Sequence, residues 1–147
     1  MFRFRGRFPH TIDDKGRLSI PARFREVLAR QEERLLFLIE SDDCITAFPE
    51  QEWQQIEAKI LEKGSMRAEA REFLRTVYSG AVETEVDGSG RILIPQAFRE
   101  AVGLSRDAMI VGVMNRFEIW NRDQFEHLLR SKAGQREGIM DKLAEYL

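Results

Sequence analysis

The chain has 147 residues, 43% of them hydrophobic and 33% charged, which is enough to bury a core and too apolar for a disordered protein. No apolar run reaches the roughly 20 residues of a membrane helix, and the cysteine and histidine content excludes disulfide scaffolds and Cys/His zinc sites. The net charge of −2 is unevenly divided: eight basic and three acidic residues give residues 1–30 a charge of +5 and leave −7 on the rest, which suggests a basic working face.

The N-terminal part of the chain predicts a strand, a turn, a second strand and a helix. Its first residues carry charge with no apolar stretch behind them, so we expect no signal peptide. Residues 7–12 alternate in polarity as a half-buried strand does. A turn containing Gly16 leads to a short strand over Arg17–Ile20. Pro21 then suits the first position of a helix, because it has no N–H to leave unpaired.

Two more strands and two helices follow this helix. The apolar segments Leu35–Glu40 and Cys44–Phe48 are predicted as strands. Trp53, Ile56 and Ile60 recur at helical spacing and share one face. Ser65 is predicted to cap a second helix that runs through Phe73 and Leu74, so the two helices form a hairpin.

The second half of the chain repeats the first. Residues 87–100 match residues 13–26 at eight of fourteen positions, and weaker similarity continues downstream. The chain is therefore a tandem duplication. The elements predicted for the second unit are a strand over residues 81–86, a turn at 88–90, a strand at 91–94, a helix after Pro95, strands at 108–113 and 117–120, and helical segments around 125–129 and 139–143.

These patterns predict an α+β protein of two interlocked units. We divide the chain into a first unit (7–52), a connecting helical hairpin (53–78), a second unit (81–124) and C-terminal helices (125–147). A unit of about 45 residues is small for a core of its own. We therefore expect the units to supply strands to one common, small β-barrel, each followed by a helical hairpin.

The basic side chains of the first unit predict a DNA-binding surface. Arginine can contact phosphates and can also bind guanine O6 and N7 together through its planar guanidinium. Lys15 and Arg17 flank Gly16 in a tight turn, where the backbone can approach a ligand closely. The other predicted DNA contacts are Arg5 and Arg7 on the preceding strand, and Arg23 on the following helix.

The two Asp-x-x-x-Arg motifs also have a structural interpretation. Asp13 and Asp87 are expected to brace their turns, because carboxylates repel phosphate. For Arg17 and Arg91, the motif alone does not decide between a role in bracing the turn and a role in binding DNA. Arg25 and Arg99, each next to a glutamate, are expected to form ordinary solvated or intersubunit pairs.

Comparison of the two copies favours DNA contact by the first. Arg5 and Lys15 correspond to Ser79 and Ser89, and Pro9 and Thr11 correspond to two glutamates, at 83 and 85. Carboxylates facing phosphates would be unfavourable. We therefore interpret Arg17 as a DNA contact, and Arg91 as part of a structural or assembly motif with Asp13 and Asp87.

No enzyme signature is present in the sequence. It holds no phosphate-binding loop, no Ser/His/Asp set and no metal-ligand spacing, and His10 occupies an inward strand position that is typical of a core residue. We predict no catalytic residue, no metal, no cofactor, no small-molecule substrate and no membrane association. The competing hypothesis is an oligomeric module of the same fold that docks an acidic protein partner.

The motifs resemble a known family. Asp13-x-x-x-Arg17 and Asp87-x-x-x-Arg91, each followed by an apolar strand, a proline and a short helix, are similar to the swapped-hairpin unit of SpoVT/AbrB-type DNA-binding domains. Two such units, with the segments Phe4-Arg5-Gly6 and Glu118-Ile119-Trp120, resemble the MraZ family over nearly the whole chain.

The resemblance implies more than the residues themselves establish. It implies a bacterial transcriptional regulator in the cytoplasm, at the nucleoid, acting largely as a repressor. Its partner would be double-stranded DNA, as repeated short boxes upstream of its own operon in the division and cell-wall gene cluster. The resemblance also implies a homo-oligomer in the form of a ring.

Overall fold

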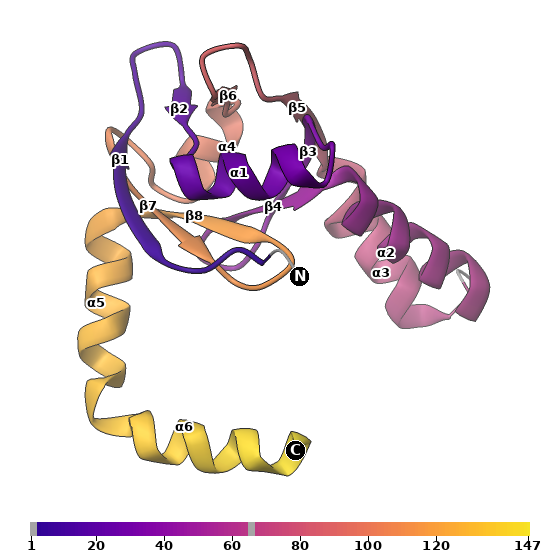
Figure 1. Cartoon of the computed structure of the whole chain (residues 1–147). Coiled ribbons are helices and arrows are strands. Elements are labelled where there is room, and N and C mark those ends of the chain that lie inside the picture. Colours follow the sequence, from indigo (N-terminus) through magenta and orange to yellow (C-terminus); the bar gives the residue numbers. More distant parts are fainter. Residues whose placement is uncertain (1–2, 65–66) are drawn as a thin grey trace.

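A computed structural model describes residues 3–64 and 67–147 and shows a mixed α+β fold (Figure 1). The first unit holds two strands, a helix, two further strands and a pair of helices, in the predicted order. They are β1 (Arg7–Thr11), β2 (Arg17–Ser19), α1 (Ala22–Arg30), β3 (Leu35–Glu40), β4 (Ile45–Pro49), α2 (Glu50–Lys63) and α3 (Ala68–Thr76).

The second unit repeats this order after a short 3₁₀ turn, η1 (Tyr78–Gly80). Pro21 and Pro95 each lie one residue before their helix, at the N-cap, and not at the predicted first helical position. The elements are β5 (Val82–Glu85), β6 (Arg91–Leu93), α4 (Gln96–Ala101), β7 (Asp107–Gly112), β8 (Phe117–Asn121), α5 (Arg122–Lys132), η2 (Ala133–Gln135), α6 (Arg136–Leu143) and η3 (Ala144–Tyr146).

Both units contribute strands to one antiparallel sheet, in which strands of the two units lie next to each other. Its order is β1-β7-β8-β4-β3-β5, so that β1 of the first unit pairs with β7 of the second, and β5 pairs with β3. A separate two-stranded ribbon joins β2 to β6, again across the units. Because most strand pairs join the two copies, neither copy contains the sheet by itself.

The sheet is open, so the prediction of a β-barrel is not confirmed. Within the described residues, β1 and β5 each pair along one edge and end the six-stranded sheet at opposite sides. The three-residue strands β2 and β6 pair with each other, and the only backbone bridge between them and these edges in the described residues joins Ile12, just after β1, to Leu18, which leaves the circle of strands incomplete.

The main core lies under the β2–β6 ribbon and contains residues from both units. Leu18 and Ile92 point inward from the ribbon and are completely or almost completely buried, as are Ile20 and Ile94 just beyond it. Phe24 of α1 packs edge-on against Phe4 and fills the space toward the sheet. This shared core fixes the position of the two turns that precede β2 and β6.

The first unit ends in a helical hairpin, as predicted. Trp53 of α2 stacks on Tyr78, with ring centroids 5.5 Å apart, and also on Phe37. The Tyr78 hydroxyl donates a hydrogen bond to the Glu57 carboxylate. These contacts hold η1, the turn that follows α3, against α2, and α3 lies beside α2 (Figure 1). Helix α3 begins at Ala68, and the predicted cap Ser65 lies outside the described residues.

The second unit does not end in a hairpin, so that part of the prediction is wrong. Helix α5 packs on β7 and β8 through Phe125, and α6 then turns away from α5 instead of folding back on it (Figure 1). Every side chain from residue 131 to residue 147 is exposed. The apolar spacing correctly indicated a helix, but α6 packs on no other part of this single chain that the structure describes.

Candidate nucleic-acid interface

The turn between β1 and β2 is braced by the carboxylate of Asp13. Its Oδ1 accepts hydrogen bonds from the backbone N–H groups of Lys15 and Arg17, each at 2.9 Å. Its Oδ2 accepts a 2.7 Å bond from Nε of Arg17. The backbone N–H of Arg17 is the main reason why the pKa of Asp13 falls to about 2, and the guanidinium of Arg17 adds to this effect.

The same bond orients the guanidinium of Arg17. It uses Nε alone, and within the described ranges no acceptor lies within hydrogen-bond distance of either Nη group. An arginine held at Nε presents its two Nη groups as donors at a fixed place, which suits recognition of a guanine edge or a phosphate. Lys15, beside it at the tip of the turn, is exposed.

The turn between β5 and β6 has the same backbone and a looser arginine. Asp87 accepts bonds from the backbone N–H groups of Ser89 and Arg91, at 2.8 and 3.0 Å. The N–H of Arg91 leads the interactions that lower the pKa of Asp87. Nε of Arg91, however, lies 3.6 Å from Asp87 Oδ2, too far for a hydrogen bond, and has no other partner in the described part of the chain.

The β2–β6 ribbon places both arginines on one outer face. Arg17 lies opposite Leu93 and Ser19 lies opposite Arg91, and residues directly opposite in an antiparallel pair share a face. Leu18 and Ile92 occupy the inner face. The sequence comparison assigned the two arginines different roles, and the structure puts them diagonally across one two-stranded ribbon.

Each turn is also held by the other unit. The Gly16 carbonyl accepts a 2.8 Å bond from the N–H of Ile94, and the Gly90 carbonyl accepts one of 2.8 Å from Ile20. Gly16 and Gly90 have φ values of +85° and +77°, which strongly favour glycine. The two turns therefore form one reciprocal structure, and they lie side by side at one end of the molecule (Figure 1).

Arg25 and Arg99 differ from the prediction of solvated or intersubunit pairs. Arg99 donates a 3.0 Å bond from Nε to the Ile94 carbonyl, and its guanidinium lies against Gly16. Arg25 packs against Gly90 in the corresponding place. Each helix arginine thus supports the turn of the opposite unit. The sequence signal for this role was present, because both arginines are identical in the two copies.

Three predicted DNA contacts lie outside this cluster. Arg23 is exposed near the start of α1, just beyond the ribbon. Arg5 and Arg7 stand at the opposite end of β1, and at about 3.3 Å per residue roughly 20 Å of strand separates Arg7 from the turn. The guanidinium of Arg7 lies over the Phe125 ring, 5.8 Å from its centre. The structure therefore does not bring Arg5 and Arg7 next to Lys15 and Arg17.

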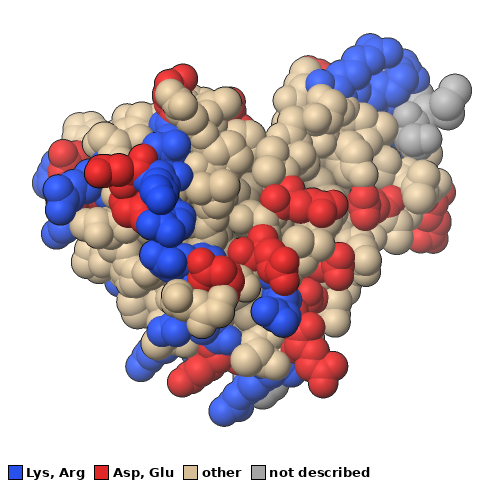
Figure 2. All heavy atoms as spheres, turned by 90° about the horizontal axis from the view of Figure 1, so that it is seen from above, with Lys and Arg blue, Asp and Glu red and all other residues tan. Residues whose placement is uncertain are grey.

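The face that carries the turns has a mixed charge pattern. Figure 2 views the molecule from this side and shows Lys and Arg side chains in a band, with acidic side chains adjoining it. Glu83 and Glu85 are exposed on the edge strand β5, where Glu85 lies 4.0 Å from Arg34. The basic band can attract a polyanion, and the acidic groups beside it restrict how one can lie.

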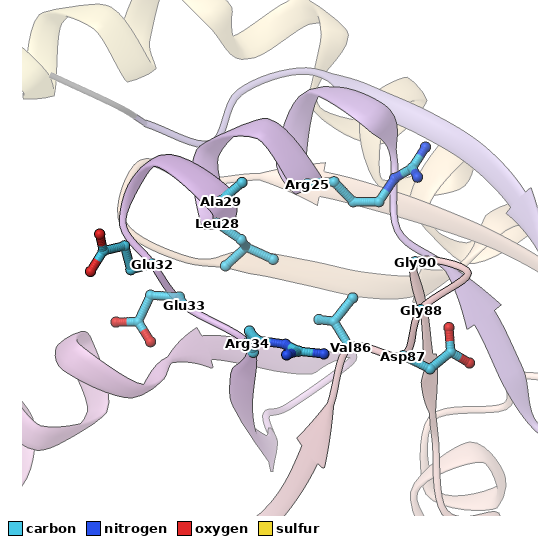
Figure 3. A pocket seen from close by; sticks show the side chains of 10 residues that line it. All are labelled: Arg25, Leu28, Ala29, Glu32, Glu33, Arg34, Val86, Asp87, Gly88 and Gly90. Atoms are coloured by element: carbon cyan, nitrogen blue, oxygen red, sulfur yellow. The ribbon is translucent and has the colours of Figure 1, made fainter.

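A groove of about 460 Å³ lies beside the second turn, between α1 and the loop after β5 (Figure 3). Leu28 and Val86 line its floor, and Arg25 lies near the end formed by Gly88 and Gly90. Glu32 and Glu33 stand at the other end, where the Glu33 carboxylate accepts a 3.0 Å bond from the backbone N–H of Gln51. Because its lining holds three carboxylates, including Asp87, against two guanidinium groups, including that of Arg34, the groove does not favour a phosphate group.

Among the described residues, the thiol of Cys44 is not activated and no cluster of metal ligands is present. Burial raises the pKa of the Cys44 thiol to about 12, so it is not a nucleophile at neutral pH. Outside residues 1, 2, 65 and 66, no three His, Cys, Asp or Glu side chains come together as metal ligands would. None of the described helices has the length and apolar content needed to cross a bilayer.

Comparison with known proteins gives consistent results along the chain. The family model described as "MraZ protein, putative antitoxin-like" matches twice, at residues 3–76 and 77–145. A protein of Moorella thermoacetica named "Transcriptional regulator MraZ" is 42% identical over 97% of this chain and 98% of its own length. Proteins of the same name from Pelotomaculum thermopropionicum and Desulforamulus reducens are 44% and 41% identical, over 97% of this chain and 96% and 95% of theirs.

Proposed function

Because the chain belongs to the MraZ family, whose curated relatives are named transcriptional regulators, we propose that it is a DNA-binding transcriptional regulator and not an enzyme. More specifically, we propose that it acts in the cytoplasm, at the nucleoid. It represses the bacterial division and cell-wall gene cluster by binding short repeated boxes upstream of its own operon. Several subunits bind together, as a ring.

The observation that carries the proposal is the pair of braced turns on one two-stranded ribbon. A two-stranded ribbon fits the major groove of B-DNA, where base pairs present distinct patterns of donors and acceptors. Asp13 holds Nε of Arg17 by a 2.7 Å bond, and the Nη groups of Arg17 have no hydrogen bond within the described residues. Such a preorganised arginine loses little conformational freedom when it binds guanine.

The other basic residues are proposed to contact phosphates. Lys15 at the tip of the same turn is placed for this role, and Arg23 stands just beyond the ribbon. Arg5 and Arg7 would reach the same duplex only about 20 Å further along it, which is about six base steps. Asp13 and Asp87 brace the turns, and the side chain of Arg91 faces the same surface as Arg17.

A ring follows from the weakness of a single contact surface. One ribbon makes few phosphate contacts, and such binding is weak and non-specific, ~10⁻⁴ to 10⁻⁶ M at physiological salt. Linked subunits that occupy repeated boxes gain affinity through effective concentration. Head-to-tail contacts between subunits would close into a ring and present the ribbons at regular intervals. We also propose that the units 7–52 and 81–124, the hairpin 53–78 and the helices 125–147 are the parts of this assembly.

Titration with two duplexes at two salt concentrations tests the proposal. One duplex carries the region upstream of the chain's own operon, and the other carries the same bases in scrambled order. We expect tighter binding to the first and a steep loss of affinity for both as salt rises, because counterions are released. Lys15→Ala should reduce the salt slope by ~1 for each phosphate contact removed, with exposed Arg130→Ala of α5 as the matched control.

The competing hypothesis makes the opposite prediction in the same experiment. A module that docks an acidic protein would show neither a preference between the two duplexes nor a regular dependence of DNA binding on salt. Binding of an acidic protein that persists where DNA binding is absent would replace the proposal. Light scattering on the free chain tests the ring part separately, because a monomer that binds one box tightly contradicts it.

A further inference from the structure

Helix α6 is the part of the molecule whose apolar surface has no partner. In the first unit, the corresponding helix α3 folds back on α2. In the second unit, Ile139, Met140 and Leu143 on α6 are 51%, 62% and 45% exposed, and Leu147 beyond it is 95% exposed. A well-formed helix that exposes this much apolar surface indicates an interaction site.

The exposed apolar residues of α6 form one stripe beside a stripe of acid groups. At 100° per residue, Ile139, Met140 and Leu143 fall within one arc of about 100°, with Arg136 at the end of that arc where the helix begins, and Leu147 follows the 3₁₀ turn after α6. Glu137, Asp141 and Glu145, spaced four residues apart, form an adjacent arc. A surface that binds α6 should therefore combine an apolar floor with a basic rim.

The hairpin of α2 and α3 offers that combination. A hollow of about 390 Å³ lies between the two helices and is lined by Glu57, Ile60, Leu61, Leu74 and Tyr78. Glu57 is already bonded by the Tyr78 hydroxyl. Leu61 is 77% exposed at the edge of this hollow, although it is a large apolar residue.

The basic rim adjoins this apolar hollow. Ile60 also lines a second hollow, of about 400 Å³, whose charged residues are Lys59, Lys63, Arg67 and a single acid, Glu69. Figure 2 shows blue side chains gathered at this tip of the hairpin, at the upper right. The apolar hollow and the basic rim are therefore side by side, in the arrangement that the two arcs of α6 require.

Charge excludes the other hollows as sites for α6. The hollow on α5 has apolar walls but carries Asp43 and Asp123, which would repel the acidic arc. The groove beside the second turn is lined by three carboxylates, Glu32, Glu33 and Asp87, against the two guanidinium groups of Arg25 and Arg34, so its lining is not mainly basic. Of the hollows described, only the one on the α2–α3 hairpin joins apolar lining to a mainly basic neighbour.

We propose that α6 of one subunit packs on the α2–α3 hairpin of the next subunit, with its apolar arc in the hollow beside Leu61 and its acidic arc against Lys59, Lys63 and Arg67. The occupant is a second copy of this chain. The contact joins two different surfaces, so it is heterologous and repeats head to tail. The inference rests on the assembly in the proposed function and supplies its interface.

Cross-linking of the full chain tests the pairing directly. A double variant, Leu61→Cys with Met140→Cys, should give a ladder of covalent multimers with a short bis-maleimide, because each subunit carries both halves of the contact. Each single variant should stay monomeric on a denaturing gel. Cys44 is only 3% exposed and does not compete for the reagent. Multimers from Met140→Cys alone would indicate symmetric α6–α6 pairing and would overturn the proposal.

Charge reversal tests the electrostatic half of the proposal. Glu137→Lys, Asp141→Lys and Glu145→Lys together should reduce the mass in light scattering to that of one chain. Adding Lys59→Glu, Lys63→Glu and Arg67→Glu should restore the oligomer. The matched control reverses Asp43 and Asp123 in the α5 hollow and should leave the mass unchanged. All of these positions are exposed, so the body of the fold is preserved.

The outcomes separate this inference from the proposed function. If the wild-type chain is oligomeric and reversal of the acidic arc leaves its mass unchanged, the interface is wrong and the ring stands. If the α5 control dissociates the oligomer and the α6 variant does not, α6 is also not the contact. If the wild-type chain is a monomer at concentrations where it binds its boxes tightly, the ring itself fails.

Discussion

The two Asp-x-x-x-Arg turns have the same backbone and hold their arginines differently. Nε of Arg17 binds Asp13 at 2.7 Å, whereas Nε of Arg91 lies 3.6 Å from Asp87 and bonds to nothing else in the described residues. In both turns the carboxylate binds two backbone N–H groups, so the aspartate determines the turn. Both copies therefore keep the aspartate that supports the turn, and they differ in how the arginine side chain is held.

The ends of the two units show a second divergence. In the first unit Trp53 and Tyr78 hold a closed hairpin, whereas in the second unit α6 leaves α5 and exposes its apolar side. A duplicated element that loses its intramolecular partner can bind the same surface type on another copy. In the proposed function and the proposed interface, the turns contact the DNA ligand and helix α6 mediates assembly.

The largest effect should follow from separating the units. Residues 1–78 contain β1, β2, β3 and β4, and of these only β3 and β4 pair with each other as strands. We expect this half to be unfolded, or to dimerise, because a second copy can supply the missing strands. Calorimetry and sizing test this prediction. A folded monomer with a sharp thermal transition would show that the cross-unit pairing is not required.

Replacing the two arginines should affect DNA binding unequally. Arg17→Ala should weaken specific binding at least tenfold, because a lost guanine contact costs ~1–3 kcal/mol per site and an oligomer repeats the loss. Arg91→Ala should weaken it less, since its side chain is not preorganised. Both pairs are partly exposed, and such pairs contribute about 0–1 kcal/mol, so we expect Tm to fall by no more than ~3 °C.

The measurements for this pair are DNA titration, calorimetry and light scattering on each variant. A folded, assembled Arg91→Ala that loses as much binding as Arg17→Ala would make the two motifs equivalent in recognition. Unfolding of Arg17→Ala would instead assign that arginine to the fold. A fall in Tm or in oligomer mass confined to Arg91→Ala would support the structural role that the sequence suggested for it.

Replacing each of the two turn glycines with alanine should show which turn is packed against the backbone of the other unit. Both residues have positive φ, which costs ~1–2 kcal/mol for a residue with a side chain. A Cβ at Gly16 would lie 2.8 Å from the Ile94 carbonyl oxygen, whereas at Gly90 the nearest atom belongs to the flexible Arg25 side chain. We expect Gly16→Ala to lower Tm more than Gly90→Ala. Equal shifts in calorimetry would show that the first turn can relax.

The order of the elements was predictable, and their pairing was not. The spacing of apolar residues and the tandem repeat located the strands and helices, because side-chain periodicity follows the local backbone conformation. Which strands pair depends on contacts between residues far apart in the chain, such as Phe8 with Ile110, and no local pattern encodes them. The same limit applies to the barrel, which is not confirmed, since an argument from unit size cannot determine whether β1 meets β5.

The prediction that residues close in the sequence form one site was wrong for part of the candidate site. Arg5 and Arg7 lie close to Lys15 in the sequence, but the extended strand β1 carries them to its opposite end, away from the turn. Arg91 is 74 positions from Arg17 and shares its face, because β2 and β6 pair. The repeat did predict the turns and the bracing pattern of their aspartates, since those interactions span only two to four residues.

The smallest effect should be the acid sensitivity of the two turns. Asp13 has a folded pKa of about 2, below its usual value of 3.8, and that of Asp87 is also lowered. A depressed pKa means that the ionised carboxylate stabilises the fold above pH 4, and that this stabilisation is lost as pH falls toward 2.

Replacing each aspartate by asparagine tests this pH dependence. Asp13→Asn keeps the side chain's size, removes the ionisation and should flatten the fall of Tm between pH 4 and 2. Asp87→Asn should do so less, because Arg91 donates no side-chain hydrogen bond to it. Thermal melts at half-unit pH intervals measure the difference, with exposed Asp14→Asn as the control. If Asp87→Asn flattens the curve as much as Asp13→Asn, the two turns are braced equally and the contrast between their arginines has no energetic consequence.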